Sequence, residues 1–173
     1  MYKIVSVNAQ SNRNNRRDFL FMLNKFRQTY FRNNPPKDYG MKLFDIAKSN
    51  KVDLYLICKN DTNIGIVELT NGEVGSQQVR CIGTIYIQAK YRKNNVSKYV
   101  YDLVEKQSNI PFCLHIEKSH FEKFKDKFWN LGFVCYGAIS DWCSDLSYNE
   151  TTYMVFRKPF SKRLLPIKLE SYS

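Results

Sequence analysis

The feature that most limits the fold of this chain is the order in which two hydrophobic periodicities follow one another. Apolar residues at every second position indicate a strand, whereas a spacing of three or four indicates a helix. Strand-type segments cover 1–7, 52–59, 64–70, 79–90, 111–116, 133–140 and 151–157, and helix-type segments cover 15–30, 39–49, 95–106 and 121–131. This order excludes a regular βαβ repeat and predicts an α+β fold with a mixed sheet.

The same spacing predicts which helix residues face the core. We expect Asn14 or Asn15 to cap the first helix. The residues expected to point inward are Phe19, Leu23, Phe26 and Tyr30 in the first helix, Met41, Phe44, Ile46 and Ala47 in the second, and Val96, Tyr99, Val100, Leu103 and Val104 in the third.

A length of 173 residues fits one globular domain, so we expect a single domain over 1–173 with a peripheral tail at 159–173. No apolar run approaches the roughly 20 residues of a membrane span. The first residues, MYKIVSVNAQ, lack the pattern of a secretory signal. We therefore expect a cytoplasmic protein without a membrane partner, either a monomer or a homodimer.

The chain is strongly basic, with 27 Lys and Arg against 16 Asp and Glu and a formal net charge of +11. Eleven of these bases and only three acids lie in residues 1–51. Arg13, Arg16, Arg17 and Arg32 surround the first helix, where they could hold a nucleic acid or another acidic acceptor through its phosphates. A solvated helix face explains the same residues equally well.

The five cysteines, at positions 58, 81, 113, 135 and 143, contain no C-x-x-C pair. They fall mostly within apolar strand-type segments, so we expect reduced, buried thiols rather than disulfides. Only His115 and His120 could join them in a metal site, and the sequence therefore predicts no metal.

The most informative stretch for function joins the strand-type segment 79–90 to the next helix. It contains Lys90, Arg92, Lys93 and Lys98, with no acid among them. A helix N-terminus carries unsatisfied N–H groups and a partial positive charge, which favour phosphate. The stretch therefore predicts a diphosphate site.

This stretch also resembles a motif of the GCN5-related N-acetyltransferase (GNAT) family. The hydrophobic-x-hydrophobic-x-x-x-Tyr-Arg run of that family is matched by Ile85, Ile87, Tyr91 and Arg92, and its Arg/Gln-x-x-Gly-x-Gly/Ala turn by residues 92–97. Downstream, Phe128-Trp129-Asn130-Leu131-Gly132-Phe133 is similar to the aromatic-x-x-Leu-Gly-Phe segment of the family. The resemblance covers about residues 64–157.

The resemblance implies a mostly antiparallel mixed sheet of about six to seven strands, flanked by about four helices. It also implies that acetyl-coenzyme A is the co-substrate. The residues expected to bind it are Ile85 and Ile87 on the strand and Arg92, Lys93, Asn94, Asn95, Val96, Ser97 and Lys98 in the turn and helix start. Asn95 replaces the central glycine of the motif, and asparagine enters the left-handed region more readily than most residues.

The usual catalytic groups of the family are missing. Cys81 stands where a carboxylate is often the base, and Phe128 stands where a tyrosine is often the acid. Our candidate catalytic residues are therefore Cys81, His115 and Tyr136, although ordinary packing in the sheet would explain each of them.

Three hypotheses remain open from the sequence. The first is an N-acetyltransferase that uses acetyl-coenzyme A and an amine acceptor. The second is a GNAT-like protein that modifies or binds nucleic acid. The third is a catalytically inert binding module of the same fold.

Overall fold

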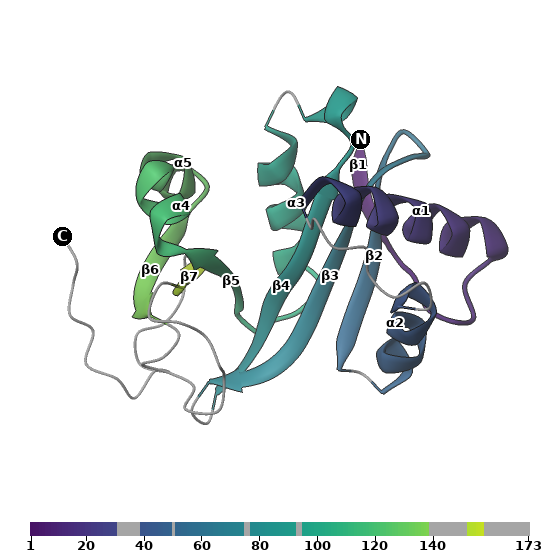
Figure 1. Ribbon diagram of the computed structural model, residues 1–173, viewed down its shortest axis with the longest axis horizontal. Helices are drawn as coiled ribbons and strands as arrows, with labels where there is room; N and C mark the ends of the chain where they lie inside the picture. Colours follow the sequence, from purple (N-terminus) through teal and green to yellow (C-terminus); the bar gives the residue numbers. More distant parts are fainter. Residues whose placement is uncertain (31–38, 50, 75–76, 93–94, 139–151, 158–173) are drawn as a thin grey trace. The chain divides into compact units, whose positions relative to one another are not determined.

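The computed structural model describes residues 1–30, 39–49, 51–74, 77–92, 95–138 and 152–157 (Figure 1). These residues form seven strands and five α-helices. The chain divides into two compact units, each taken by itself below. Unit 1 comprises Met1–Asn71 and Gly83–Ser108, and unit 2 comprises Gly72–Ile82 and Asn109–Ser173.

Unit 1 contains four neighbouring strands in the order β1-β2-β3-β4. Strand β1 (Tyr2–Ser6) pairs antiparallel with β2 (Val52–Lys59), and β2 pairs antiparallel with β3 (Thr62–Val74). Asn60 and Asp61, both with positive φ, form the β2–β3 turn, because such residues tolerate the left-handed conformation. Strand β4 (Gln77–Ile87) passes from unit 2 into unit 1.

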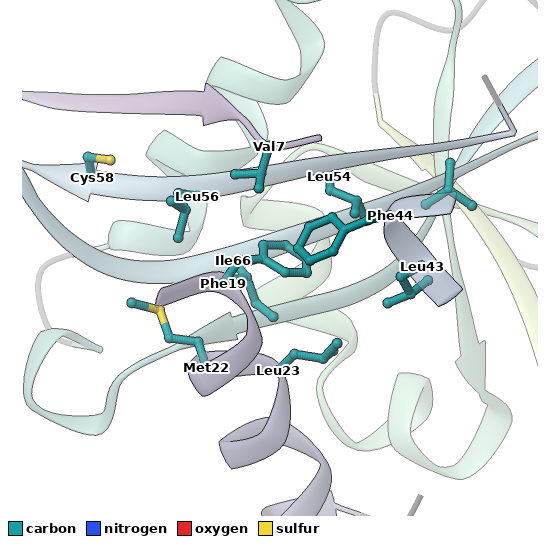
Figure 2. Close-up of a cluster of buried hydrophobic side chains, with 11 residues drawn as sticks. Val7, Phe19, Met22, Leu23, Leu43, Phe44, Leu54, Leu56, Cys58 and Ile66 are labelled. Carbon is teal, nitrogen blue, oxygen red and sulfur yellow. The ribbon is translucent and has the colours of Figure 1, made fainter. Parts of the chain in front are cut away.

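The core of unit 1 lies where two helices cover β2 and β3 (Figure 2). Helix α1 (Arg13–Tyr30) contributes Phe19, Met22 and Leu23, and helix α2 (Tyr39–Lys48) contributes Leu43 and Phe44. The rings of Phe19 and Phe44 lie 5.9 Å apart, which joins the two helices over the sheet. Helix α3 (Val96–Glu105) packs on β1, where Tyr99 stacks on Tyr2.

Several expectations for the helices of unit 1 need correction. The cap of α1 is Asn12, whose Oδ1 accepts the backbone N–H of Asn15 at 2.8 Å, and not Asn14 or Asn15. Leu43 replaces the expected Ile46 in the core, and Ile46 is exposed. In α3, Tyr101 is buried, whereas Tyr99 lies half exposed on its partner Tyr2.

Unit 2 contains the order β4-β5-β7-β6. Strand β5 (Phe112–Glu117) runs parallel to β4 from Arg80↔Phe112 to Ile82↔Leu114. Strand β7 (Thr152–Arg157) lies antiparallel to both β5 and β6 (Phe133–Ala138). The chain crosses from β5 to β6 through two short helices, α4 (Lys118–Lys123) and α5 (Lys125–Asn130).

These two helices correct the single helix expected over 121–131, because Phe124 leaves helical geometry at φ −120° and ψ 21°. Gly132, at φ 86°, ends α5 in the left-handed conformation expected of a glycine after a helix. The predicted α+β class with a mixed, mostly antiparallel sheet is confirmed. No helix in the described segments has the length and hydropathy that crossing a membrane requires.

Candidate functional site

The end of β4 is fixed in unit 1 by hydrogen bonds from the residues that follow it. The backbone N–H of Gln88 donates to Ile64 O at 2.9 Å, and its side chain donates to Asn63 O at 3.1 Å. Arg92 folds back so that its Nε donates to Ile87 O at 2.7 Å, while its guanidinium lies 5.6 Å from the Tyr86 ring centre. The turn therefore starts from a rigid strand end.

Asn95 reverses the chain at the start of α3. It adopts φ 55° and ψ 27°, the left-handed conformation that a central glycine would adopt without strain. Its carbonyl accepts the N–H groups of Lys98 at 2.9 Å and Tyr99 at 3.4 Å, which makes it the N-cap of the helix. The expectation that asparagine can enter the left-handed region at this position is confirmed.

The first two amides of α3 belong to Val96 and Ser97. The N–H groups of Val96 and Ser97 donate to no other residue within the described ranges. Val96 is buried and anchors the helix start, Ser97 is half-buried, and Lys98 is exposed. Ile85 is half-buried and Ile87 is buried on β4, whereas Lys93 and Asn94 lie outside the described residues.

Two of the three candidate catalytic residues come together in unit 2. Cys81 Sγ lies 3.4 Å from His115 Nε2 and 3.0 Å from Cys113 Sγ. The parallel register places Cys81 opposite Cys113, and the two-residue period of a strand puts His115 on the same face as Cys113. The hydrogen bond with Cys113, together with His115, lowers the pKa of Cys81 to about 5 in spite of burial.

The third candidate, Tyr136, is not part of that cluster in the described contacts. It lies on β6 where the register with β7 shifts between Cys135 and Ala138, and its side chain lies outside what the structure describes. Its catalytic role stays a prediction.

Glu68 is a candidate that the sequence analysis missed. It lies on β3 with 9% of its surface exposed and accepts the Thr84 hydroxyl of β4 at 3.0 Å. Burial raises the pKa of the Glu68 carboxyl, although the Thr84 hydrogen bond and the charge of Arg27 act in the opposite direction. Such perturbed, buried acids are concentrated at functional sites. The sequence signal that could have identified Glu68 is its position as the one acid within the apolar run Ile64–Leu69, IGIVEL.

Two of the four basic residues proposed to bind an acidic acceptor, Arg16 and Arg17 on α1, already contact other groups of the protein. Arg16 Nη1 donates to Ala9 O at 3.1 Å, and Arg17 pairs with Asp18 at 3.5 Å. Arg13 is exposed at the first turn, and Arg32 lies outside the described residues. Binding of nucleic acid stays a prediction.

The protein is similar to known proteins in structure rather than in sequence. No protein-family model matches the sequence, and no curated protein matches it. A GNAT acetyltransferase from Staphylococcus aureus is 17% identical with a TM-score of 0.61, covering 91% of this chain and 98% of its own. An acetyltransferase from Thermus thermophilus is 10% identical with a TM-score of 0.63, covering 92% and 97%.

A third similar structure is Arabidopsis thaliana Naa50 in complex with the bisubstrate analogue CoA-Ac-MVNAL. It is 16% identical with a TM-score of 0.53, covering 91% of this chain and 99% of its own. At these identities the similarity lies in the fold, and it extends over nearly all of each chain. This protein therefore has the fold of the GCN5-related N-acetyltransferases, as a divergent example of it.

Proposed function

We propose that this protein is an N-acetyltransferase that moves an acetyl group from acetyl-coenzyme A to an amine by direct attack on the thioester. The observation that carries the proposal is the left-handed Asn95, which opens α3 immediately after a basic turn. The fold supports it, because structures of this fold include acetyltransferases and a complex with a coenzyme A bisubstrate analogue.

The residues at the start of α3 suit the diphosphate of acetyl-coenzyme A. The amides of Val96 and Ser97 supply N–H donors, and the helix dipole adds partial positive charge. The cradle would comprise Arg92, Lys93, Asn94, Asn95, Val96, Ser97 and Lys98, with the backbone of Ile85 and Ile87 along the pantetheine arm. The bound co-substrate supplies an activated acetyl thioester.

The amine must lose its proton to attack, and we propose that the Glu68 carboxylate takes up this proton as the general base. A general base works best when its pKa lies near the working pH, and burial moves the pKa of this carboxyl in that direction. The reaction forms a C–N bond and breaks the C–S bond, the amine proton passes to the Glu68 carboxylate, and the leaving thiolate takes up a proton from solvent. Holding both reactants in place can itself contribute several kcal/mol.

The first test measures binding by thermal unfolding with coenzyme A and acetyl-coenzyme A. At about 100 times the dissociation constant, binding contributes about 2.7 kcal/mol, which corresponds to a rise in melting temperature of roughly 5 to 10 °C. Arg92→Gln should weaken this shift, whereas Lys106→Gln, at the opposite end of α3, should not. No shift with either compound would overturn the proposal.

The turn itself is tested by a pair of substitutions at Asn95. Asn95→Gly should retain binding, because glycine adopts the left-handed conformation freely. Asn95→Val should lose binding, because a β-branched residue resists positive φ. Release of free thiol with a panel of amines then measures transfer, and Glu68→Gln should lower kcat with unchanged coenzyme A binding. Equal binding by both Asn95 variants would contradict the assigned cradle.

A further inference from the structure

A group of three soft donor side chains lies on two adjacent strands of unit 2. The sulfurs of Cys81 and Cys113 are 3.0 Å apart, and His115 Nε2 is 3.4 Å from Cys81 Sγ. All three donor atoms lie within 4.8 Å of one another. Within the described ranges, no other group of three His, Cys, Asp or Glu residues is arranged in this way.

The backbone holds these donors in fixed positions. Cys81 and Cys113 face each other in the parallel β4–β5 register. On its other side β5 pairs with β7 from Cys113↔Phe156 to Glu117↔Thr152, so Cys113 and His115 both lie on a strand with ladder partners. Sites built on strands are more precise than sites built on loops.

The donor set is suited to a thiophilic cation. Thiolate and imidazole are the usual ligands of zinc, which bonds sulfur at about 2.3 Å and nitrogen at about 2.0 Å. At tetrahedral angles these bond lengths place donor atoms roughly 3.5 to 3.8 Å apart. The Cys81–His115 distance of 3.4 Å is close to this range, the two sulfurs need to separate by less than about 1 Å, and Cys113 Sγ and His115 Nε2 lie within 4.8 Å of each other.

We propose that Cys81, Cys113 and His115 bind one zinc ion that joins β4 to β5. Three protein ligands leave the fourth tetrahedral position open, which is the arrangement of zinc sites that bind water or a substrate. Cys81 and His115 are partly buried and Cys113 is buried. The proposal does not depend on acetyl transfer, and it assigns Cys81 and His115 a role other than the catalytic one considered above.

A disulfide is the competing use of two neighbouring thiols. Cys81 and Cys113 are both free thiols, with their sulfurs 3.0 Å apart. His115 Nε2 lies 3.4 Å from Cys81 Sγ, and a disulfide would not involve this third donor. Two thiols and an imidazole at one point favour a metal over a cross-link.

The experiment measures metal in the full-length protein. Protein prepared under reducing conditions with zinc, then desalted, should retain roughly one zinc ion per chain by elemental analysis. Cys81→Ser, Cys113→Ser and His115→Ala should each lower zinc affinity by more than the roughly 10- to 100-fold typical of losing a supporting residue. Cobalt(II) substitution should give the intense visible bands of a tetrahedral thiolate site in the parent only.

Cys58→Ser is the matched control. Cys58 is a buried thiol of unit 1 that donates to Asn63 Oδ1 at 3.1 Å, so serine preserves that contact and zinc retention should be unchanged. Circular dichroism of each metal-free variant separates loss of zinc from loss of folding. The proposal is overturned if the folded parent retains no zinc, or if the three variants retain as much zinc as the parent.

Discussion

At the scale of single residues, Gly65 shows how closely β3 and β4 approach one another in unit 1. A Cβ built at this position would clash with Tyr86 O and lie 3.2 Å from Ile87 Cα, both backbone atoms. The position is also buried. Only glycine fits, and the end of β4 that leads into the Asn95 turn depends on it.

Gly65→Ala should therefore lower the free energy of unfolding. Forcing a methyl group into a packed site costs about 1 to 3 kcal/mol. Gly72→Ala is the matched control, because nothing lies within 4 Å of a Cβ there, and its effect should stay within about 0.5 kcal/mol. Urea unfolding of the two variants measures the difference, and equal stabilities would show that β4 shifts away without cost.

The buried Glu68 carboxyl should make the free energy of unfolding depend on pH. Burial raises its pKa in the folded state, so the folded protein holds this proton more tightly than the unfolded chain does. Its contribution to stability is therefore fully present below about pH 4, near the pKa of an unfolded glutamate, and is lost as the pH rises through the folded value.

Glu68→Gln should remove this dependence. The amide oxygen can still accept the Thr84 hydroxyl, but the group has no charge to bury. Relative to the parent, the variant should gain stability as the pH rises from about 4 to about 8. Thermal unfolding across this range measures the gain, and the exposed Glu122→Gln serves as the control. A difference independent of pH would refute the raised pKa.

At the scale of elements, the N-terminus of α1 gives a direct test of the corrected cap. Asn12→Ala removes the oxygen that accepts the Asn15 N–H and should cost about 1 kcal/mol. Asn14→Ala, inside the helix and exposed, should be neutral or slightly stabilising because alanine favours helices. Urea unfolding ranks the two variants, and the reverse ranking would restore Asn14 as the cap.

The sequence predicted the element order well because periodicity is a local property. The spacing of Phe19 and Leu23 placed α1 on the sheet, and Asn95 was expected in the conformation that it adopts. The wrong predictions concern residues whose burial or helical geometry depends on contacts with other elements, which the spacing of apolar residues does not show. Tyr99 has apolar spacing but stacks on Tyr2 of β1, and a break at Phe124 divides α4 from α5.

The site was harder to predict because its groups meet through strand pairing rather than spacing. Cys81 and Cys113 are 32 residues apart, and only the β4–β5 register makes them partners. Glu68 and Thr84 meet in the same manner across β3 and β4. A sequence pattern shows which residues share a strand face, but it does not show which residue stands opposite.

At the scale of the whole molecule, two strands belong to both units: β3 (Thr62–Val74) crosses after Asn71, and β4 (Gln77–Ile87) crosses after Ile82. The first residues of β4 pair with β5 in unit 2, and its last residues lie beside Gly65 in unit 1. A strand that breaks in the middle loses ladder hydrogen bonds and side-chain packing together. If residues 1–173 form a single domain, as expected, both units should unfold in one cooperative transition.

Trp129 lies on α5 of unit 2, so in a Trp142→Phe background its fluorescence follows unit 2, while circular dichroism follows the whole chain. In a single cooperative domain, Gly65→Ala in unit 1 should lower the fluorescence and dichroism midpoints equally, by on the order of 1 M urea. Two independent units would instead leave the fluorescence midpoint at its parent value. Because Gly65 lies in unit 1 and Trp129 in unit 2, a common shift requires that the two units unfold together, and β3 and β4 are the strands whose backbones run through both.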